Sequence, residues 1–294
     1  MEKVVIAGGT GFIGNYFEER FEELGYEVKI ISRQSPYIPW DDQAGIIEAL
    51  ENAQILINLA GKSVNCRYNE ANKREIIDSR TRTTTLLGES ILKCENPPNL
   101  WINSSTATIY RHAEDRPMTE EEGEIGTGFS VEVAKTWEEC FFDFNLPQTR
   151  QIALRIAIVL GPGGGVMTPY INLTRFGLGG PQGPGTQMFS WIHVEDLFQI
   201  VRFLEEREDL DGVFNCSAPK PVSNRELMRQ FRQAMNVPIG LPAPKWMLEL
   251  GAVLIKTETE LVLKSRWVLP KRLEQAGYAF RFRSLRDTLE NILT

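Results

Sequence analysis

Residues 3–14 read KVVIAGGTGFIG, a short apolar run followed at once by glycines. The run is typical of a strand buried on both faces, and apolar residues then recur at helical spacing from Phe12 to Leu24. Gly8 permits a tight turn, Gly11 leaves the backbone open to a pyrophosphate, and Gly14 allows the helix to pack closely on the sheet. The strand–turn–helix context therefore predicts a dinucleotide-binding turn, the alternative being a glycine-rich turn without a ligand.

The start of that helix adds an electrostatic reason for the same prediction. Its first N–H groups have no partner within the helix, and the helix dipole places positive charge there, so both favour phosphate. The residues expected to contact the dinucleotide are Gly8, Thr10, Gly11, Phe12, Ile13 and Gly14.

The rest of the first half alternates between strand-like and helix-like segments. Expected strands are 27–32, 55–59, 100–105 and 151–160, and expected helices are 70–93 and 131–144. This alternation predicts an α/β fold, a Rossmann-type doubly wound parallel sheet. We expect residues 1–160 to form the dinucleotide-binding domain, completed by about 186–217 with a helix at 194–206 and a strand at 212–217.

The character of the chain changes after Leu160. Residues 161–185 are rich in glycine and proline around a short helical stretch at 167–176, and short helices broken by prolines follow Pro219. We expect 161–185 and 218–294 to form a smaller, mainly helical substrate lobe over the C-terminal edge of the sheet. The segment 161–185 either lines a ligand cleft or is a long surface loop.

The end of the second strand distinguishes NADP from NAD. NAD sites usually carry an acidic residue there, which holds the ribose 2′-hydroxyl. This chain has Ser32 followed by Arg33. A hydroxyl beside a guanidinium suits a 2′-phosphate through a charge-assisted hydrogen bond. We therefore predict NADP (NADPH) as the cofactor; the alternative is that Arg33 is only a solvated surface charge.

The third strand ends in Asn58-Leu59-Ala60-Gly61. Small residues at this edge leave room for the adenosine and ribose of the cofactor, so Leu59, Ala60 and Gly61 are candidate contacts. An ordinary transition from strand to loop is the alternative.

Bulk composition excludes several function classes. The formal net charge of −7 argues against nucleic acid or an anionic membrane as the main partner. The 4 cysteines are widely spaced and predict free thiols in a reducing compartment. No segment is long and apolar enough for a membrane span or a signal peptide, so a cytoplasmic location is expected. The 2 histidines are far apart, and no metal site or Ser-His-Asp set is expected.

Several motifs together resemble one family. GGTGFIG, NLAG, SSTATIY at 104–110 and LRIAIVLGP at 154–162 are similar to the extended short-chain dehydrogenases/reductases, the NAD(P)-dependent epimerase/dehydratase superfamily. GGP at 179–181, WIHVED at 191–196, SAP at 217–219 and VLPKRL at 268–273 resemble its "epimerase family protein" branch of the YfcH/YfhF type. That branch carries a C-terminal domain of unknown function. The resemblance implies a small-molecule substrate, a sugar nucleotide among the options, and a homodimer formed through helices 70–93 and 131–144.

The resemblance also implies catalytic residues. In the wider family a Ser/Thr orients the substrate, a tyrosine transfers a proton, and a lysine four residues later holds the ribose and lowers the tyrosine pKa. Thr106 and Lys135 match the Ser/Thr and the lysine, and Arg80 matches a polar position near the cofactor. Val131 stands where the tyrosine is expected and cannot carry a proton. Lys135 and Arg80 could instead be plain surface cations.

Three interpretations of the missing tyrosine stay open. Tyr110 supplies the proton, or instead packs against the ligand; the reaction needs only a weak acid such as water; or the protein binds NADPH without turnover, as a regulator or scaffold. We therefore predict an NADP-dependent oxidoreductase or sugar-nucleotide epimerase-like enzyme with an atypical site, the alternative being a non-catalytic NADPH-binding protein. His193 is expected to have a structural role rather than a catalytic one.

Overall fold

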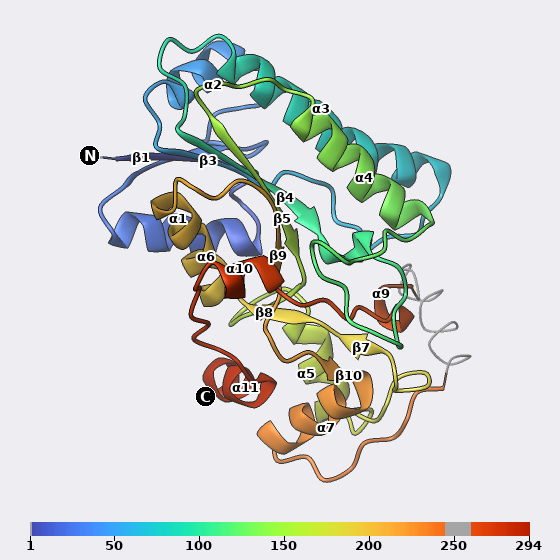
Figure 1. The fold of residues 1–294 in the computed structure, drawn as a ribbon. Helices are drawn as coiled ribbons and strands as arrows, with labels where there is room; N and C mark the ends of the chain where they lie inside the picture. The colour runs from blue at the N-terminus through green and yellow to red at the C-terminus, as the bar shows by residue number, and fades with distance from the viewer. Residues whose placement is uncertain (1, 245–259) are drawn as a thin grey trace.

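The main sheet has six parallel strands in the order β2-β1-β3-β4-β5-β9 (Figure 1). The structure is a computed structural model that describes residues 2–244 and 260–294. The strands are β1 Lys3–Ala7, β2 Glu27–Ile31, β3 Ile55–Asn58, β4 Leu100–Thr106, β5 Arg150–Ile156 and β9 Gly212–Cys216. This arrangement confirms the predicted Rossmann-type α/β fold.

Helices cover both faces of the sheet, as the strands' continuous apolar runs require. One face is covered by α2, α3 and α4, the other by α1 and α6 (Figure 1). Val4 and Ile6 belong to the core under α1 and α6, whereas Val5 and Ala7 belong to the core under α2, α3 and α4. The helices are α1 Phe12–Glu23, α2 Gln43–Leu50, α3 Glu70–Ile91, α4 Phe129–Phe142 and α6 Val194–Glu206.

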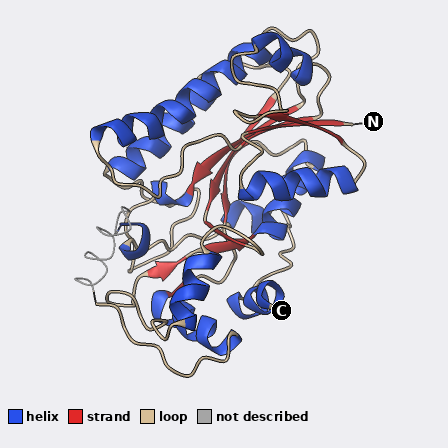
Figure 2. Ribbon diagram, turned by 180° about the vertical axis from the view of Figure 1, so that it is seen from behind, coloured by secondary structure: helices blue, strands red, loops and turns tan. Residues whose placement is uncertain are grey.

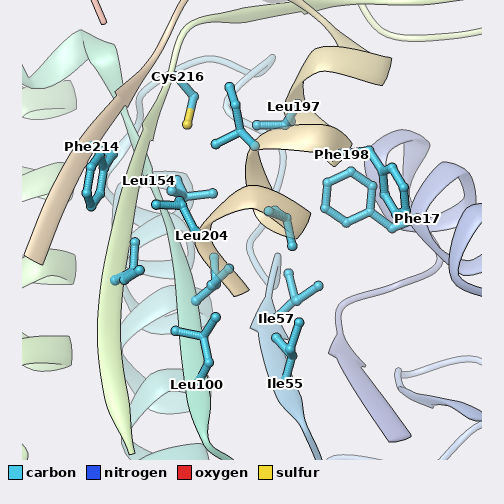
Figure 3. Close-up of a cluster of buried hydrophobic side chains, with 14 of the residues drawn as sticks. Phe17, Ile55, Ile57, Leu100, Leu154, Leu197, Phe198, Leu204, Phe214 and Cys216 are labelled. Carbon is cyan, nitrogen blue, oxygen red and sulfur yellow. The ribbon is translucent and has the colours of Figure 1, made fainter. Parts of the chain in front are cut away.

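Aromatic rings fill much of the core between the sheet and α1 and α6. Phe17 of α1 meets Phe198 of α6 edge to face, with ring centroids 5.6 Å apart. Figure 3 shows this pair beside the leucines of α6 and the inward side chains of β3, β4 and β5. Edge-to-face pairs add stabilisation beyond the area that they bury. The core therefore fixes α1, and with it the turn that precedes the helix.

The strand order reverses between β1 and β3. In open α/β sheets, ligands bind in the crevice outside the carboxyl ends of the strands at such a reversal. The turn 8–11 follows β1 and the loop 59–62 follows β3, so the fold brings these two predicted binding segments to one crevice.

The second lobe lies beyond the carboxyl ends of the strands and is mainly helical (Figure 2). Besides the main sheet there are two small two-stranded sheets, β10-β7 and β6-β8. Its helices are α5 Met167–Arg175, α7 Asn224–Ala234, α9 Glu260–Leu263, α10 Lys271–Gln275 and α11 Leu285–Leu293. Its strands are β6 Ile158–Leu160, β7 Met188–Phe189, β8 Trp191–His193 and β10 Val222–Ser223.

Two sequence-based expectations differ from the structure. The run 151–160 is not one strand, because β5 ends at Ile156 and β6 leaves the main sheet to pair with β8. Helix α2 was not expected; it begins after Asp42, whose side chain accepts the N–H of Gly45. An apolar run continued through both β5 and β6, so periodicity alone could not show the change of sheet.

The WIHVED segment joins α6 to the C-terminal end of the chain. Asp196 is fully buried and accepts the N–H groups of Arg281 and Phe282 at 2.9 and 2.8 Å. His193 caps the first turn of α6 by accepting the N–H of Glu195, and its other ring nitrogen lies 3.1 Å from Asn291 Oδ1. These contacts give His193 the structural role that the sequence predicts.

We predict that Gly14→Ala strongly destabilises the fold. A Cβ at Gly14 would lie 2.2 Å from the carbonyl oxygen of Gly9, so the turn or α1 must move. We expect the free energy of unfolding, measured in urea, to fall by about 3 kcal/mol.

Gly11→Ala is the matched control for that variant. A Cβ at Gly11 would meet nothing within 4 Å, and its φ of −94° suits any residue. We expect it to change the free energy of unfolding by no more than about 1 kcal/mol, the usual range for a cap position. Equal losses in the two variants would contradict the packing assignment.

Candidate functional site

The glycines of the β1–α1 turn have different surroundings. Gly8 has φ +78°, and a Cβ there would lie 2.7 Å from Cα of Ala60, so the turn touches the loop after β3. Gly11 faces open space, and α1 begins at the next residue with no side chain capping its N–H groups. Open backbone in front of uncapped N–H groups fits a pyrophosphate.

The end of β2 lies beside the same turn. Ser32 is 4% exposed, and its Oγ is 3.2 Å from Oγ1 of Thr10, which links the two segments. The next residue, Arg33, is exposed, and within the described ranges no carboxylate pairs with it. The structure therefore brings Thr10 and Ser32 together, and the exposed Arg33 follows Ser32 directly in the chain; a hydroxyl and a guanidinium are both groups that bind phosphate.

A buried hydrogen-bond network fixes the loop after β3. Asn58 Oδ1 accepts the N–H of Ala60 at 3.1 Å, while Asn58 Nδ2 donates to Asn103 Oδ1 at 2.7 Å and to Thr84 Oγ1 at 3.1 Å. Trp137 Nε1 also donates to Thr84 Oγ1, at 3.0 Å. The network ties β3, β4, α3 and α4 together and sets the path of residues 59–61. Sequence reasoning found the loop but missed these partners, because they come from four separate elements.

Arg80 lies directly beneath that loop. A Cβ at Gly61 would be 3.0 Å from Cζ of Arg80, so the loop passes close to the Arg80 guanidinium. Its Nη1 donates to the carbonyl oxygens of Lys62 and Ile76 at 3.1 and 3.0 Å, and its guanidinium lies 5.0 Å from the ring centroid of Trp137. Burial lowers the pKa of Arg80 to about 10. Arg80 is thus a largely buried support for the loop rather than a surface cation.

Phe12 connects the turn to the glycine-rich segment that follows β6. Cβ atoms at Gly161 and Gly164 would lie 2.9 and 2.4 Å from the Phe12 ring. The backbone of this segment therefore packs directly against the ring, and a side chain at either glycine would clash with it. Ile13 instead packs against the core under α1. The predicted contact residues Phe12 and Ile13 therefore have visible packing roles, and residues 161–165 border the same crevice.

The predicted catalytic positions lie at the end of β4 and on α4. Thr106 ends β4, and its Oγ1 accepts the N–H of Thr108 at 3.1 Å, which leaves the hydroxyl proton free to donate. Lys135 is exposed and makes no hydrogen bond or ion pair within residues 2–244 and 260–294. Val131 is 1% exposed and packs in a cluster with Ala107, Tyr110 and others that includes Val268 of the second lobe.

Tyr110 lies in a closed polar network. Its hydroxyl donates to Asn215 Oδ1 at 2.9 Å and accepts from Nη1 of Arg155 at 2.9 Å, while Arg155 also pairs with Glu138 at 2.7 Å. The ring is 2% exposed, and burial raises the pKa of its hydroxyl although Arg155 opposes the shift. This environment holds the Tyr110 hydroxyl between Arg155 and Asn215, and it shows neither of the two roles predicted for Tyr110, proton transfer or packing against the ligand.

In the described residues there is no group of three or more His, Cys, Asp or Glu side chains that could hold a metal ion. Nor is any helix there long and apolar enough to cross a membrane.

Family models match most of the chain. Residues 4–217 match the NAD dependent epimerase/dehydratase family, and residues 243–292 match a domain of unknown function, DUF1731. The human epimerase family protein SDR39U1 is 32% identical over 99% of both chains. The Bacillus subtilis epimerase family protein YfhF is 29% identical over 99% of this chain and 97% of its own.

Solved structures agree with these matches. The crystal structure of human SDR39U1 with NADPH is similar with a TM-score of 0.89 and 31% identity, over 99% of this chain and 98% of that one. A UDP-glucose 4-epimerase from Thermotoga maritima, solved with UDP-glucose, has a TM-score of 0.76 over 99% of this chain and 97% of its own, but only 18% identity. The second likeness shows the shared fold alone.

We predict that Tyr110→Phe lowers stability. The variant leaves Asn215 and one arm of Arg155 buried without their partner, which costs about 1–3 kcal/mol in the free energy of unfolding. Urea unfolding measures the loss. Tyr37→Phe, at a half-buried tyrosine whose hydroxyl has no hydrogen bond among the described residues, is the control and should change stability little. An unchanged stability in Tyr110→Phe would contradict the structural role.

Proposed function

The chain belongs to the NAD dependent epimerase/dehydratase family, and we propose that it binds NADPH and acts as an oxidoreductase on a small polar substrate. The observation that carries the proposal is the open backbone at Gly11, in front of the uncapped start of α1 and at the switch point of the sheet. The human relative bound to NADPH, at 31% identity, supports the choice of cofactor.

In this proposal each segment of the crevice holds one part of the cofactor. Residues 8–14 receive the pyrophosphate, Thr10, Ser32 and Arg33 the 2′-phosphate, and residues 59–61 the adenosine ribose, while Arg80 supports the loop from below. The exposed Arg33 directly follows the buried Ser32 in the chain, and a dianionic phosphate is the group that best matches a guanidinium and a hydroxyl together.

The substrate would lie between β4, residues 161–165 and the second lobe. NADPH supplies a hydride when bound, so the chain must orient a carbonyl and deliver a proton. Thr106 keeps a free hydroxyl proton to orient the carbonyl oxygen, and Lys135 is the uncommitted cation on α4. Tyr110 has no part in proton transfer here, because its hydroxyl is already shared between Arg155 and Asn215.

A non-catalytic NADPH-binding protein is the second candidate, and Val131 favours it. The side chain at this position is an aliphatic group in a closed apolar cluster, so no proton carrier stands where the family usually has tyrosine. A turnover assay separates the two candidates, since both predict NADPH binding.

We predict that Arg33→Ala weakens NADPH binding selectively. Loss of a charge-assisted hydrogen bond to the 2′-phosphate costs about 1.5–3 kcal/mol, or about 10- to 100-fold in Kd. NADH, which lacks that phosphate, should bind with nearly unchanged affinity. Calorimetric titration of nucleotide-free protein measures both constants, with Arg286→Ala at an exposed arginine of α11 as the control. Tighter binding of NADH than of NADPH to the unaltered protein would overturn the assignment.

We also expect NADPH oxidation with a subset of small carbonyl compounds. The assay follows the absorbance of reduced nicotinamide while the protein is offered panels of carbonyl compounds and nucleotide sugars. Thr106→Val keeps the shape of the side chain but removes its donor, and should lower any observed kcat at least tenfold without a matching change in NADPH affinity. Tight NADPH binding with no turnover across the panels would favour the regulatory alternative instead.

A further inference from the structure

Four exposed apolar side chains lie on two segments of the second lobe. Directly after α5, Phe176 and Leu178 are 76% and 40% exposed. On the loop after α7, Ile239 and Leu241 are 64% and 58% exposed. These are 4 of the 9 large apolar residues that are exposed in the described part of the chain, so exposed apolar surface is concentrated here. We refer to the four side chains as the apolar patch.

Hydrogen bonds hold the two segments side by side. The N–H of Leu241 donates to the carbonyl oxygen of Gly177 at 2.8 Å. Arg232 of α7 touches both segments, because its Nη1 donates to the carbonyl oxygen of Gly179 at 2.5 Å and a Cβ at Gly240 would lie 2.6 Å from the same nitrogen. The bonds use backbone groups, and they leave the apolar side chains in solvent.

Two further cations lie next to these segments. Arg175 is the last residue of α5, directly before the apolar patch. Arg225 lies beside Gly185, where an added Cβ would be 3.5 Å from the Cβ of the arginine. Both arginines are exposed, and no carboxylate pairs with either of them in residues 2–244 and 260–294. Their charge is therefore available to an anionic partner.

The charge of the whole chain is distributed unevenly. Residues 1–160 carry 16 Lys or Arg and 25 Asp or Glu, a formal net charge of −9. Segments 161–185 and 218–244 together carry 5 Lys or Arg and 1 Glu, a formal net charge of +4. The loop after α7 runs along the end of the second lobe that lies farthest from the main sheet (Figure 1, Figure 2). The net charge of −7, on which the expectation of no anionic membrane partner rests, thus averages over two ends of opposite sign.

We propose that this end of the second lobe binds to the surface of an anionic lipid bilayer. The apolar patch enters the boundary between headgroups and acyl chains, and the neighbouring arginines contact the anionic headgroups. The opposite charges of the two ends orient the molecule, with the acidic dinucleotide-binding domain away from the bilayer. This contact is peripheral and requires no membrane-spanning helix.

The shape of the surface favours a bilayer over an acidic protein segment. Peptides that dock through apolar side chains lie in a groove or extend the edge of a sheet. The groove between α7 and α11 is lined by residues such as Arg229, Arg232 and Arg286, and its lining includes none of the apolar patch. Side chains that project into solvent need no complementary surface when they enter the headgroup region of a bilayer.

The experiment measures sedimentation of the full chain with vesicles. Vesicles of phosphatidylcholine alone are compared with vesicles that also contain phosphatidylserine. We expect at least tenfold tighter binding to the second kind, and added salt should weaken it because it screens the charges. Phe176→Ser with Leu241→Ser should weaken the binding at least tenfold by removing apolar surface. Arg175→Gln with Arg225→Gln should weaken it at least tenfold by removing charge.

The controls alter matched residues of the dinucleotide-binding domain. Leu92, at the end of α3, is 59% exposed, and the next residue, Lys93, is exposed as well. Leu92→Ser and Lys93→Gln should bind vesicles like the unaltered protein, and thermal unfolding confirms that every variant is folded. Binding that is absent, that ignores phosphatidylserine, or that falls equally in the controls and the patch variants would overturn the proposal.

Two other occupants of the apolar patch are tested in the same way. Polyglutamate is an acidic chain without a bilayer, and we expect the Leu241→Ser change to leave its binding unaltered. Polyglutamate binding as tight as vesicle binding, and lost in Leu241→Ser, would assign the patch to an acidic protein segment instead. Light scattering measures the oligomeric state, and a dimer that dissociates in Leu241→Ser would assign the patch to a second copy of the chain.

Discussion

The close backbone contact between the β1–α1 turn and the loop after β3 is the constraint on which the crevice depends. A Cβ at Gly8 would come within 2.7 Å of the Ala60 backbone. A second close approach, between Gly14 and Gly9, holds α1 against the same turn. Between these two crowded positions, a Cβ at Gly11 would meet nothing within 4 Å. The part of the turn that stays open is therefore the part that leads to the uncapped N–H groups of α1.

The sequence predicted this part of the molecule well because its signals are local. The strands of the main sheet contain short groups of apolar residues, and Gly8, Gly11 and Gly14 stand at fixed offsets from one another. The sequence-based prediction of one strand over 151–160 was wrong. The chain changes sheet after Ile156, and the sequence does not show this because apolar residues continue on both sides of the change. The candidate contacts of the crevice come together as expected, while their roles in binding stay predictions.

The sequence could not predict the hydrogen-bond partners of the site residues, because these partners come from elements far apart in the chain. The direct hydrogen-bond partners of Asn58 lie up to 45 positions away, and the contact of Lys264 with Thr108 spans 156 positions. No periodicity or motif spacing encodes such a contact. Tyr110 shows the same limit: it stood near Thr106 in the sequence, yet its hydroxyl is taken up by Arg155 and by Asn215 of β9.

The packing of Val131 has a consequence for protein engineering. Its side chain is 1% exposed and shares a cluster with Val268 of the second lobe. A tyrosine there would need space that Ala107, Met118 and Val268 already fill, and overpacking of this kind costs about 1–3 kcal/mol or more. A Val131→Tyr substitution would thus be penalised unless several neighbours became smaller at the same time. Packing excludes a phenol from this position of α4, so a proton carrier could be placed there only by redesigning the surrounding cluster, not by one substitution.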